Sequence, residues 1–288
     1  VSGPKNAGFQ AVYTIYNYSD KRKREERKLM KNIKIIFFDI DGTLIDIEKK
    51  QISENTLKAL TELKKNGIRI CIATGRAPML VPEFPGVDFD AFLTFNGSYC
   101  FDKEQDIFSN PLKKEDVAVI IKNATEIGRP VSLAMKHRLA ANGTDQDLSD
   151  YYSIAGIEVQ IDEDFEALAQ NEEIYQIMVG CLDAEHAALM KNAGNAKLAA
   201  WWDRAADIIP ADGGKGTAVR EILRYYGLTK EEAAAFGDGN NDIEMLRAVG
   251  TGIAMGNASE GLKAAADEVC GTAADDGVYF WCRNNGLI

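Results

Sequence analysis

The sequence predicts an α/β protein whose core is a doubly wound, Rossmann-like parallel sheet, with an α+β domain inserted into it. Three observations predict this class. Continuous apolar runs, which are typical of strands covered on both faces, occur in the first third and again in the last third of the chain. Segments with helical spacing lie between these runs. The middle third has a different pattern, and a length of 288 residues accommodates about two domains.

The composition is that of an ordinary globular protein. Hydrophobic residues make up 46% of the chain and charged residues 27%, which argues against a disordered, collagen-like or disulfide-rich protein. No apolar run approaches the ~20 residues of a membrane-spanning helix, so we expect a soluble protein with no membrane partner. The net charge of −11 argues against general binding to nucleic acids, because such binding requires positive side chains that neutralise phosphates.

We expect a cytoplasmic location. The five cysteines are widely spaced and include no CxxC pair, a pattern that favours free thiols in a reducing compartment. The apolar stretch at residues 8–18 precedes the basic run at 21–28, whereas a signal peptide places its positive charge first. Residues 1–29 show no sustained periodicity, and we expect them to be a dispensable N-terminal extension before Met30.

The first half of the core is expected within residues 30–111. Three apolar runs there are expected to be buried strands: 33–38, 68–73 and 91–95. A helix is expected at 53–66, because leucines recur every three residues, Ser53 suits the N-cap and Gly67 follows the end. Strand, helix and strand with short joints form a βαβ unit, which requires parallel strands.

An Asn-Gly dipeptide, Asn96-Gly97, directly follows the third predicted strand. This dipeptide is a turn signal, and we expect the runs 98–101 and 107–109 to form a hairpin after it. The dipeptide Asn110-Pro111 then marks the end of this half of the core.

Residues 112–209, called the insert below, predict an α+β domain. A helix is expected near 113–127. Short strands are expected near 131–135, 138–142, 157–161, 174–180, 197–202 and 207–209. Helical segments lie between several of these strands, and this mixture of short elements distinguishes the insert from the core.

The buried-strand pattern returns after Pro210. Helices are expected at 216–226 and 242–249, and apolar strands at 233–236 and 251–255. We therefore expect residues 30–111 and 210–288 to form one core that the insert interrupts.

Two carboxylates follow the first strand, in the run Asp39-Ile40-Asp41-Gly42-Thr43. In an extended chain residues i and i+2 point to the same side, so we expect both carboxylates to face one spot. In open α/β sheets, ligands bind beyond the carboxyl ends of the strands. Two adjacent acids there repel each other unless a cation or a proton intervenes, and Gly42 lets the backbone come close to a ligand. A plain Asp turn at a strand end is the alternative.

Two further turns carry groups that suit an anion. Thr74-Gly75-Arg76 follows the second strand, where a hydroxyl and free backbone N–H groups form a phosphate cradle. Lys215 lies among glycines at the start of the helix after the insert, which favours anion binding over the usual role of a solubilising lysine. Each signal alone is weak, because Thr-Gly turns and exposed lysines are common.

Acidic and carboxamide side chains gather again at residues 237–242, in the run GDGNND that follows another predicted strand. Asn240 as a helix cap and Asp242 as a partner of the helix dipole are the plain alternatives. Oxygen ligands without His or Cys favour Mg²⁺. The two histidines, His137 and His186, both lie in the insert, which argues against a histidine metal site or a Ser-His-Asp triad.

The four motifs, in this order, resemble those of the haloacid dehalogenase superfamily. From about residue 31 to residue 288 the chain looks like the Cof-type subgroup of Mg²⁺-dependent phosphatases. The first and fourth motifs are specific together, whereas the Thr74 and Lys215 motifs gain weight from their positions. The resemblance implies that the insert is a C2B-type cap, which sets substrate specificity.

The resemblance also implies a role for each motif residue. Asp39 is expected to be the nucleophile that forms an aspartyl-phosphate, and Asp41 the general acid and then the general base. Mg²⁺ is expected on the Asp39 carboxylate, the Asp41 backbone carbonyl and Asp238, while Asp242 orients this ligand shell or Lys215. Lys215 is expected to stabilise the transferring phosphoryl group. The expected contacts to phosphate or substrate are Gly42, Thr43, Thr74, Gly75, Arg76, Lys215 and Asn241.

The implied reaction is the hydrolysis of the phosphate ester of a small metabolite. A phosphomutase of the same superfamily is the first alternative, although the insert shows no arginine-rich phosphate-binding motif. A non-catalytic protein that binds a phosphorylated metabolite is the second. Sugar phosphates, nucleotides, flavin mononucleotide and pyridoxal phosphate stay open as substrates, and so does the oligomeric state.

Overall fold

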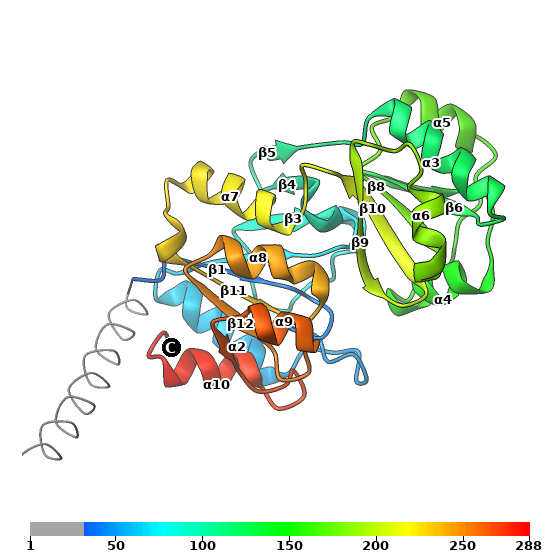
Figure 1. Cartoon of the computed structure of the whole chain (residues 1–288). Coiled ribbons are helices and arrows are strands. Elements are labelled where there is room, and N and C mark those ends of the chain that lie inside the picture. Colours follow the sequence, from blue (N-terminus) through cyan, green and yellow to red (C-terminus); the bar gives the residue numbers. More distant parts are fainter. Residues whose placement is uncertain (1–31) are drawn as a thin grey trace, which may run out of the picture.

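The structure, a computed structural model, describes residues 32–288, whose strands form two sheets that lie side by side (Figure 1). The predicted extension at residues 1–29 lies outside the described residues. The core strands, in spatial order, are β13 (Glu268–Val269), β12 (Thr251–Ala254), β11 (Ala233–Gly237), β1 (Ile35–Phe38), β2 (Arg69–Ala73), β3 (Ala91–Thr94), β4 (Tyr99–Phe101) and β5 (Asp106–Ser109). Strands β13 to β3 are parallel, and β4 and β5 form an antiparallel hairpin at the edge.

Helices cover both faces of this core sheet (Figure 1). One face carries α2 (Glu54–Lys65) and α10 (Gly277–Asn284), and the other carries α7 (Lys215–Tyr226), α8 (Ile243–Ala248) and α9 (Glu260–Ala265). Short 3₁₀ turns complete the core: η1 (Pro78–Leu80), η2 (Phe95–Gly97), η4 (Lys230–Glu232) and η5 (Asn240–Asp242). The predicted doubly wound α/β class is confirmed.

The sequence signals of α2 act as expected. The Ser53 side chain accepts a hydrogen bond from the Thr56 backbone N–H and caps the first turn. Gly67 follows the last turn with a φ of +79°, a conformation that glycine adopts without a steric penalty. The buried side of this helix packs on the sheet through Ala59, Leu60 and Leu63.

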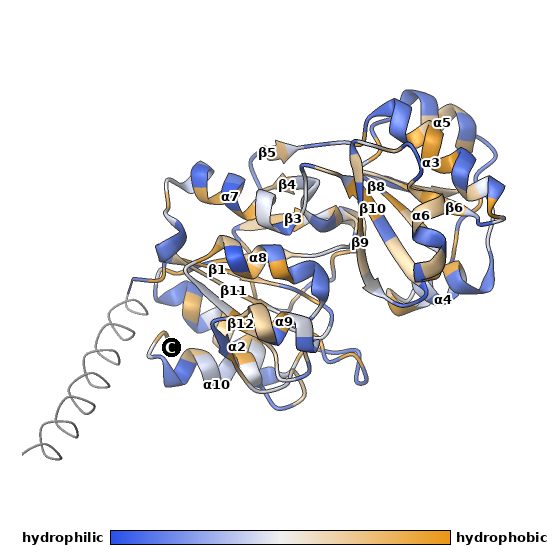
Figure 2. Ribbon diagram, in the orientation of Figure 1, coloured by the Kyte–Doolittle hydropathy of each residue, from blue (hydrophilic) through white to orange (hydrophobic). Residues whose placement is uncertain are grey.

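The strands of the core are apolar because both of their faces are covered. All four residues of β1 are fully buried, and in β1 and β11 the rings of Phe38 and Phe236 stack with centroids 5.3 Å apart. Figure 2 shows the same separation along the chain, with hydrophobic residues in the strands and hydrophilic residues on the outer sides of the helices. This burial holds the carboxyl ends of the central strands in fixed positions.

The second sheet is antiparallel, and its strands in spatial order are β7 (Arg138–Ala141), β6 (Val131–Met135), β8 (Gln176–Gly180), β10 (Ala205–Pro210) and β9 (Ala196–Trp202). One face is covered by α3 (Lys114–Glu126), α5 (Phe165–Asn171) and, after the turn η3 (Asp183–Glu185), α6 (His186–Leu189). Helix α4 (Gln146–Ile154) packs on the opposite face.

The face with α4 also packs against the core. Along β6, Leu133 belongs to the cluster under α3, whereas its neighbour Ala134 belongs to a cluster that contains Phe95 of the core. Within this second cluster the rings of Phe95 and Tyr175 stack with centroids 5.4 Å apart. Aromatic packing therefore fixes the insert against the edge of the core sheet.

The strand expected at residues 157–161 is wrong. The segment forms a single isolated bridge, between Ala141 and Ile161, and no strand. Ile157 and Val159 pack against the α4 cluster, while Ile161 is 62% exposed. The alternating apolar pattern therefore reflects packing of one side of a loop, because its backbone pairs with β7 only at the end of the segment, where Ala141 is bonded to Gln160 and Asp162.

The C-terminal part contains elements that the sequence analysis did not predict. These are α9, α10 and the two-residue strand β13. A strand of two residues is too short to show a periodicity, so its existence depends on the neighbouring β12.

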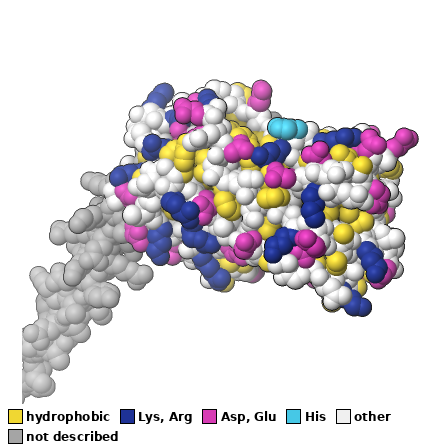
Figure 3. Space-filling view, turned by 90° about the horizontal axis from the view of Figure 1, so that it is seen from above, with side chains coloured by type: hydrophobic (Ala, Val, Ile, Leu, Met, Phe, Trp, Pro, Cys, Tyr) yellow, Lys and Arg dark blue, Asp and Glu magenta, His cyan; other side chains and the backbone are white. Residues whose placement is uncertain are grey.

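Charged side chains of both signs are interspersed on the described surface in Figure 3, with scattered apolar side chains between them. Of the described helices, none is both long enough and apolar enough to cross a bilayer. All five cysteines lie in the described part of the chain as free thiols, and four of them are buried.

Candidate active site

The predicted motifs meet at the carboxyl edge of the core sheet. Strands β2, β1 and β11 are adjacent and parallel, and Thr74, Asp39 and Asp238 directly follow them. Lys215 begins α7, which packs against α8 and on β3, β4 and β5 of the same sheet. Four segments that are distant in sequence therefore contribute side chains to one site.

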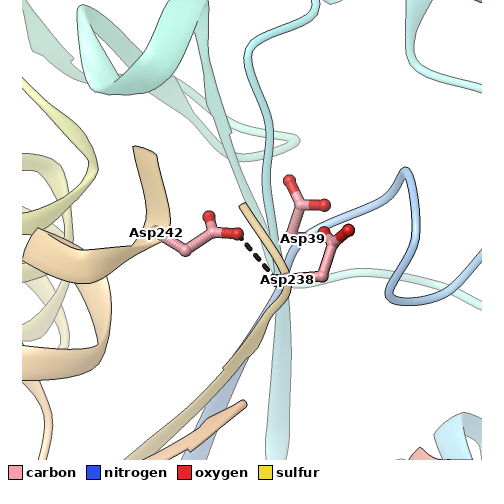
Figure 4. Close-up of side chains that lie close together, drawn as sticks. All are labelled: Asp39, Asp238 and Asp242. Carbon is pink, nitrogen blue, oxygen red and sulfur yellow. Dashed lines mark hydrogen bonds between the residues drawn. The ribbon is translucent and has the colours of Figure 1, made fainter. Parts of the chain in front are cut away.

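Three carboxylates converge there (Figure 4). Asp39, Asp238 and Asp242 each offer an oxygen atom, and these atoms lie within 4.8 Å of one another. Asp39 is 7% exposed and Asp242 only 1%. Oδ2 of Asp242 accepts hydrogen bonds from the backbone N–H groups of Asp238 and Gly239, at 3.0 and 3.1 Å. Asp242 thereby stabilises the turn that presents Asp238.

Lys215 is the cation of this cluster. Its side chain is fully buried, and Nζ donates to Oδ1 of Asp39 at 2.7 Å and to Oδ1 of Asp242 at 2.6 Å. Burial alone lowers the pKa of the ammonium, but the charges of Asp242 and Asp39 outweigh it and raise the pKa above its usual value. Lys215 is therefore a fixed positive charge beside Asp39.

The carboxylates are crowded even with this lysine. Burial raises the pKa of Asp39 to about 7; the charge of Lys215 opposes this shift, and the neighbouring carboxylates Asp242 and Asp41 add to it. Burial and the charge of Asp39 also raise the pKa of Asp238 well above its usual value. Three carboxylates and one ammonium leave an excess of negative charge, which a further cation would neutralise.

Asp41 lies beside the cluster but pairs with another group. Strand β1 ends at Phe38, so the extended geometry assumed for the motif does not continue through it. The Asp41 carboxylate is held by Arg76, with Nε to Oδ2 at 2.8 Å and Nη2 to Oδ1 at 2.7 Å. Nη1 of Arg76 also donates to the carbonyl of Leu80 at 3.1 Å. Arg76 of the second motif therefore orients the carboxylate of Asp41 in the first motif.

The remaining residues of the first and second motifs line the same turns. The hydroxyl of Thr43 donates to Oδ1 of Asp238 at 3.4 Å, and Oγ1 of Thr74 accepts from the backbone N–H of Arg76 at 3.1 Å. The carbonyl of Gly75 accepts a hydrogen bond from Gln176 of the insert at 3.2 Å. The structure thus brings these residues to the edge of the acidic cluster, while their contacts to a phosphate stay predictions.

Gly42 is required by its backbone and by its neighbour. Its φ is +85°, and a Cβ atom at this position would lie 2.1 Å from Oδ2 of Asp238. Gly67 has a similar φ of +79°, but a Cβ there would meet nothing within 4 Å. A substitution at Gly67 therefore measures the cost of the backbone conformation alone, and one at Gly42 measures that cost together with the cost of the contact with Asp238.

We expect Gly42→Ala to destabilise the protein more than Gly67→Ala. Both substitutions force a left-handed conformation on alanine, at a cost of about 1–2 kcal/mol. Gly42→Ala also displaces Asp238, and such overpacking adds about 1–3 kcal/mol. Urea denaturation of the two variants measures the difference in the free energy of unfolding. Equal destabilisation would show that the turn moves aside freely.

Asn241, the last predicted contact residue, is joined to residues that the sequence analysis missed. Its Nδ2 donates to Oδ1 of Asn96 at 3.0 Å, and Asn96 contacts Gln176 and Asp207 of the insert. The sequence analysis treated Asn96 only as part of a turn. The position of Asn96 could have indicated a role in the site, because Asn96-Gly97 follows β3 at the same sheet edge as the motifs.

A cavity of about 140 Å³ adjoins this site. It lies between the core, which contributes Lys215, Asn96 and Asn241, and residues 197–200 of β9 in the insert. Lys197 of β9 also forms an ion pair with Glu244 of α8, with Nζ to Oε1 at 3.0 Å. A small ligand in this cavity would contact both parts of the chain.

Comparison with known proteins agrees with this arrangement. A family model described as haloacid dehalogenase-like hydrolase matches residues 36–281. The chain belongs to this family. The Bacillus subtilis (strain 168) protein named "Putative phosphatase YkrA" is 32% identical over 256 residues, which cover 88% of this chain and 98% of the relative. From the same organism, 5-amino-6-(5-phospho-D-ribitylamino)uracil phosphatase YitU is 28% identical over 270 residues, covering 85% and 94%.

A solved structure also resembles this haloacid dehalogenase-like hydrolase over nearly its whole length. The sugar phosphatase BT4131, described as a member of HAD subclass IIB, superposes with a TM-score of 0.80 at 31% identity, covering 88% of this chain and 100% of the other. The predicted superfamily and a phosphatase activity are confirmed. The roles of individual residues are a separate matter and stay predictions.

Proposed function

We propose that this hydrolase removes phosphate from a small phosphorylated metabolite in two steps, through an aspartyl-phosphate on Asp39. The observation that carries the proposal is the buried pairing of Asp39 with Lys215 beside Asp238 and Asp242. A carboxylate is a weak nucleophile unless its approach to a negatively charged phosphoryl group is compensated. The fixed ammonium of Lys215 supplies part of that compensation, and Asp242 holds Lys215 in place.

In the first step a carboxylate oxygen of Asp39 attacks phosphorus, and the bond from phosphorus to the leaving oxygen breaks. Asp41 gives a proton to that oxygen. In the second step water attacks the phosphorus of the aspartyl-phosphate, Asp41 accepts a proton from the water, and the bond between phosphorus and Asp39 breaks. The products are inorganic phosphate and the alcohol, and both aspartates return to their starting states.

Arg76 supports the role of Asp41 by orienting its carboxylate. A carboxyl group that donates a proton carries hydrogen on one oxygen. The pair with Arg76, which engages both oxygens, therefore has to open on one of them before Asp41 acts as an acid. The released guanidinium nitrogen is then available to a phosphate oxygen, which is the contact predicted for Arg76.

The residues of the site fit a magnesium ion. All donors are oxygen atoms, and the excess negative charge calls for a hard cation. We propose that the ion is held by the carboxylates of Asp39 and Asp238 and by the backbone carbonyl of Asp41. Both oxygens of Asp242 already accept hydrogen bonds, which supports a role for it behind the ligands. Bound Mg²⁺ would reduce the repulsion between the nucleophile and the phosphate.

Removal of the metal is expected to abolish activity reversibly. After treatment with EDTA and metal analysis, the protein should release no phosphate from p-nitrophenyl phosphate, and added Mg²⁺ should restore turnover, because the clustered carboxylates repel a phosphate group unless a further cation compensates them. Zn²⁺ should not substitute for Mg²⁺, because the site offers no His or Cys ligand. Full activity in the metal-free protein would contradict the proposal.

We infer a division of labour along the chain, with chemistry in residues 30–111 and 210–288 and specificity in the insert, 112–209. The cavity between the motif turns and β9 supports this division. YitU and BT4131 are named for substrates that carry phosphate on a polyhydroxylated carbon chain, and this class is our first choice for the substrate. Because the thiols are free, we also propose a cytoplasmic enzyme.

A screen of phosphorylated metabolites, with released phosphate as the readout, tests the substrate class. The panel should contain sugar and sugar-alcohol phosphates beside nucleotides, flavin mononucleotide and pyridoxal phosphate. Phosphate release without a bisphosphate activator separates the phosphatase from a phosphomutase. Preference for the nucleotides or cofactors would contradict our choice of substrate class.

A further inference from the structure

A path of buried polar side chains joins the insert to the core beside the cavity. Asn96 of η2, Gln176 of β8 and Asp207 of β10 are each 1% exposed or less. Nδ2 of Asn96 donates to Oδ2 of Asp207 at 2.8 Å and to Oε1 of Gln176 at 3.1 Å. Buried polar groups are costly unless they are hydrogen-bonded, so this path is a specific feature of the interface between the insert and the core.

The path reaches the site at two points. Oδ1 of Asn96 accepts from Nδ2 of Asn241, and Nε2 of Gln176 donates to the carbonyl of Gly75 at 3.2 Å. Asn241 and Gly75 belong to the fourth and second motifs. The carboxamides of Asn96 and Gln176 therefore link the insert to two turns of the site.

The backbone at Asn96 supports this linking position. Its φ is +52°, in the left-handed region that asparagine tolerates better than most residues. A Cβ atom on Gly75 would lie 3.0 Å from Nδ2 of Asn96, so the carboxamide packs directly on the Thr74-Gly75 turn. The turn brings the carboxamide into the interface, where its donors and its acceptor are all used.

Asp207 sets the direction of these hydrogen bonds from the side of the insert. A carboxylate offers only acceptors, so Asn96 has to present its N–H groups to Asp207 and its carbonyl oxygen to Asn241. Asn241 in turn has to donate. Because the same N–H₂ group of Asn96 donates to Oε1 of Gln176, Gln176 has to present its own N–H groups to Gly75. The carbonyl of Gly75 offers only an acceptor too, so the orientation of the carboxamides agrees with acceptors at both ends, the buried acid of the insert and the Gly75 carbonyl of the core.

We propose that Asp207 is a positioning residue for the phosphatase reaction, which it supports by orienting Asn241 and the Gly75 turn through Asn96 and Gln176. The kinetic part of this inference rests on the proposed function, because it requires Asn241 to contact phosphate or substrate. The structural part does not, because it concerns the direction of hydrogen bonds in the protein alone.

NMR spectroscopy of the full chain tests the structural part. The side-chain N–H₂ signal of Asn241 is assigned from its loss in Asn241→Ala. Asp207→Asn keeps the size of the side chain but removes its charge and offers a donor as well as an acceptor, which weakens its hold on the Asn96 carboxamide, so the Asn241 signal should shift or split. Asn96→Gly, which tolerates a positive φ, should shift it as well. An unmoved signal in both variants would overturn the proposal.

Tyr151 and Tyr152 offer a matched pair of controls on α4. The hydroxyl of Tyr151 donates to Oδ1 of Asp207 at 2.6 Å, whereas that of Tyr152 is paired with Ser132 inside the insert. Tyr151→Phe should move the Asn241 signal in the same sense as Asp207→Asn but less. Tyr152→Phe removes a buried hydroxyl from the same helix and should leave the signal in place. Equal shifts in both would mean that any change in α4 disturbs Asn241.

Kinetics with p-nitrophenyl phosphate and Mg²⁺ test the functional part. Asp207→Asn should lower kcat/KM by about ten- to hundredfold, as is usual for residues that orient a site from behind. In an Asn241→Ala background the same substitution should have little further effect, because the path to the site is already cut. Independent, multiplicative losses would show that Asp207 acts only on general stability and would overturn the proposal. If the unmodified protein hydrolyses no phosphate ester, the proposed function fails, while the NMR result still decides the direction of the network.

Discussion

Asp39→Asn is expected to reduce turnover to the uncatalysed background and to prevent formation of a covalent phosphoenzyme. An amide oxygen carries no charge and is too weak a nucleophile to displace the leaving group. Asparagine has nearly the same size and keeps an oxygen that can accept from Lys215, so the fold should survive. Intact-mass measurement after an acid quench checks for phosphate on the protein, and phosphate release measures turnover.

Asp41→Asn is the matched comparison, because it keeps the nucleophile. General acid–base assistance is worth about 10²–10⁴-fold, so turnover should fall strongly. With a good leaving group, which needs little protonation, the first step recovers while attack by water stays slow. The aspartyl-phosphate should then accumulate on Asp39. An acid-stable phosphoenzyme on the same peptide in Asp39→Asn would show that the nucleophile lies elsewhere.

Lys215→Met is expected to impair both activity and stability. It leaves the carboxylates of Asp39 and Asp242 buried without their ammonium, and breaking a buried ion pair costs about 3–5 kcal/mol. Loss of a preorganised positive group beside the phosphoryl oxygens should lower kcat by at least about 10²–10³-fold. Urea denaturation and steady-state kinetics measure the two effects.

The pH profile separates electrostatics from a general loss of structure in Lys215→Met. Lys215 opposes the rise in the pKa of Asp39, so removing it raises that pKa further. Because Asp39 reacts as a carboxylate, the acid limb of kcat/KM should move to higher pH. Arg220→Met removes an exposed positive charge from the same helix and should leave the profile unchanged. An unmoved acid limb in Lys215→Met would contradict the assigned role.

Local sequence patterns predicted most elements of the core because burial there depends on contiguous residues. The run at 33–38 forms β1, and the leucine pattern at 53–66 forms α2. The residues that cap this helix lie next to it in the sequence, so its ends could be predicted locally. The same rules failed at 157–161, where the apolar residues alternate but the backbone pairs with β7 through only one isolated bridge. A strand needs a partner for its backbone, and the sequence of one segment carries no information about its neighbour.

The sequence by itself determined the family, the order of the four motifs and their position after parallel strands, because residue type and spacing carry these features. Only the tertiary structure decided which side chains share a charge or a hydrogen bond. Lys215 meets Asp39 across 176 residues of chain, Arg76 meets Asp41 across 35, and Asn96 meets Asp207 across 111. Such pairs form because sheet order brings distant strand ends together. The physical reason is that hydrogen bonds and buried charges act over a few ångströms, a distance that spacing along the chain does not encode.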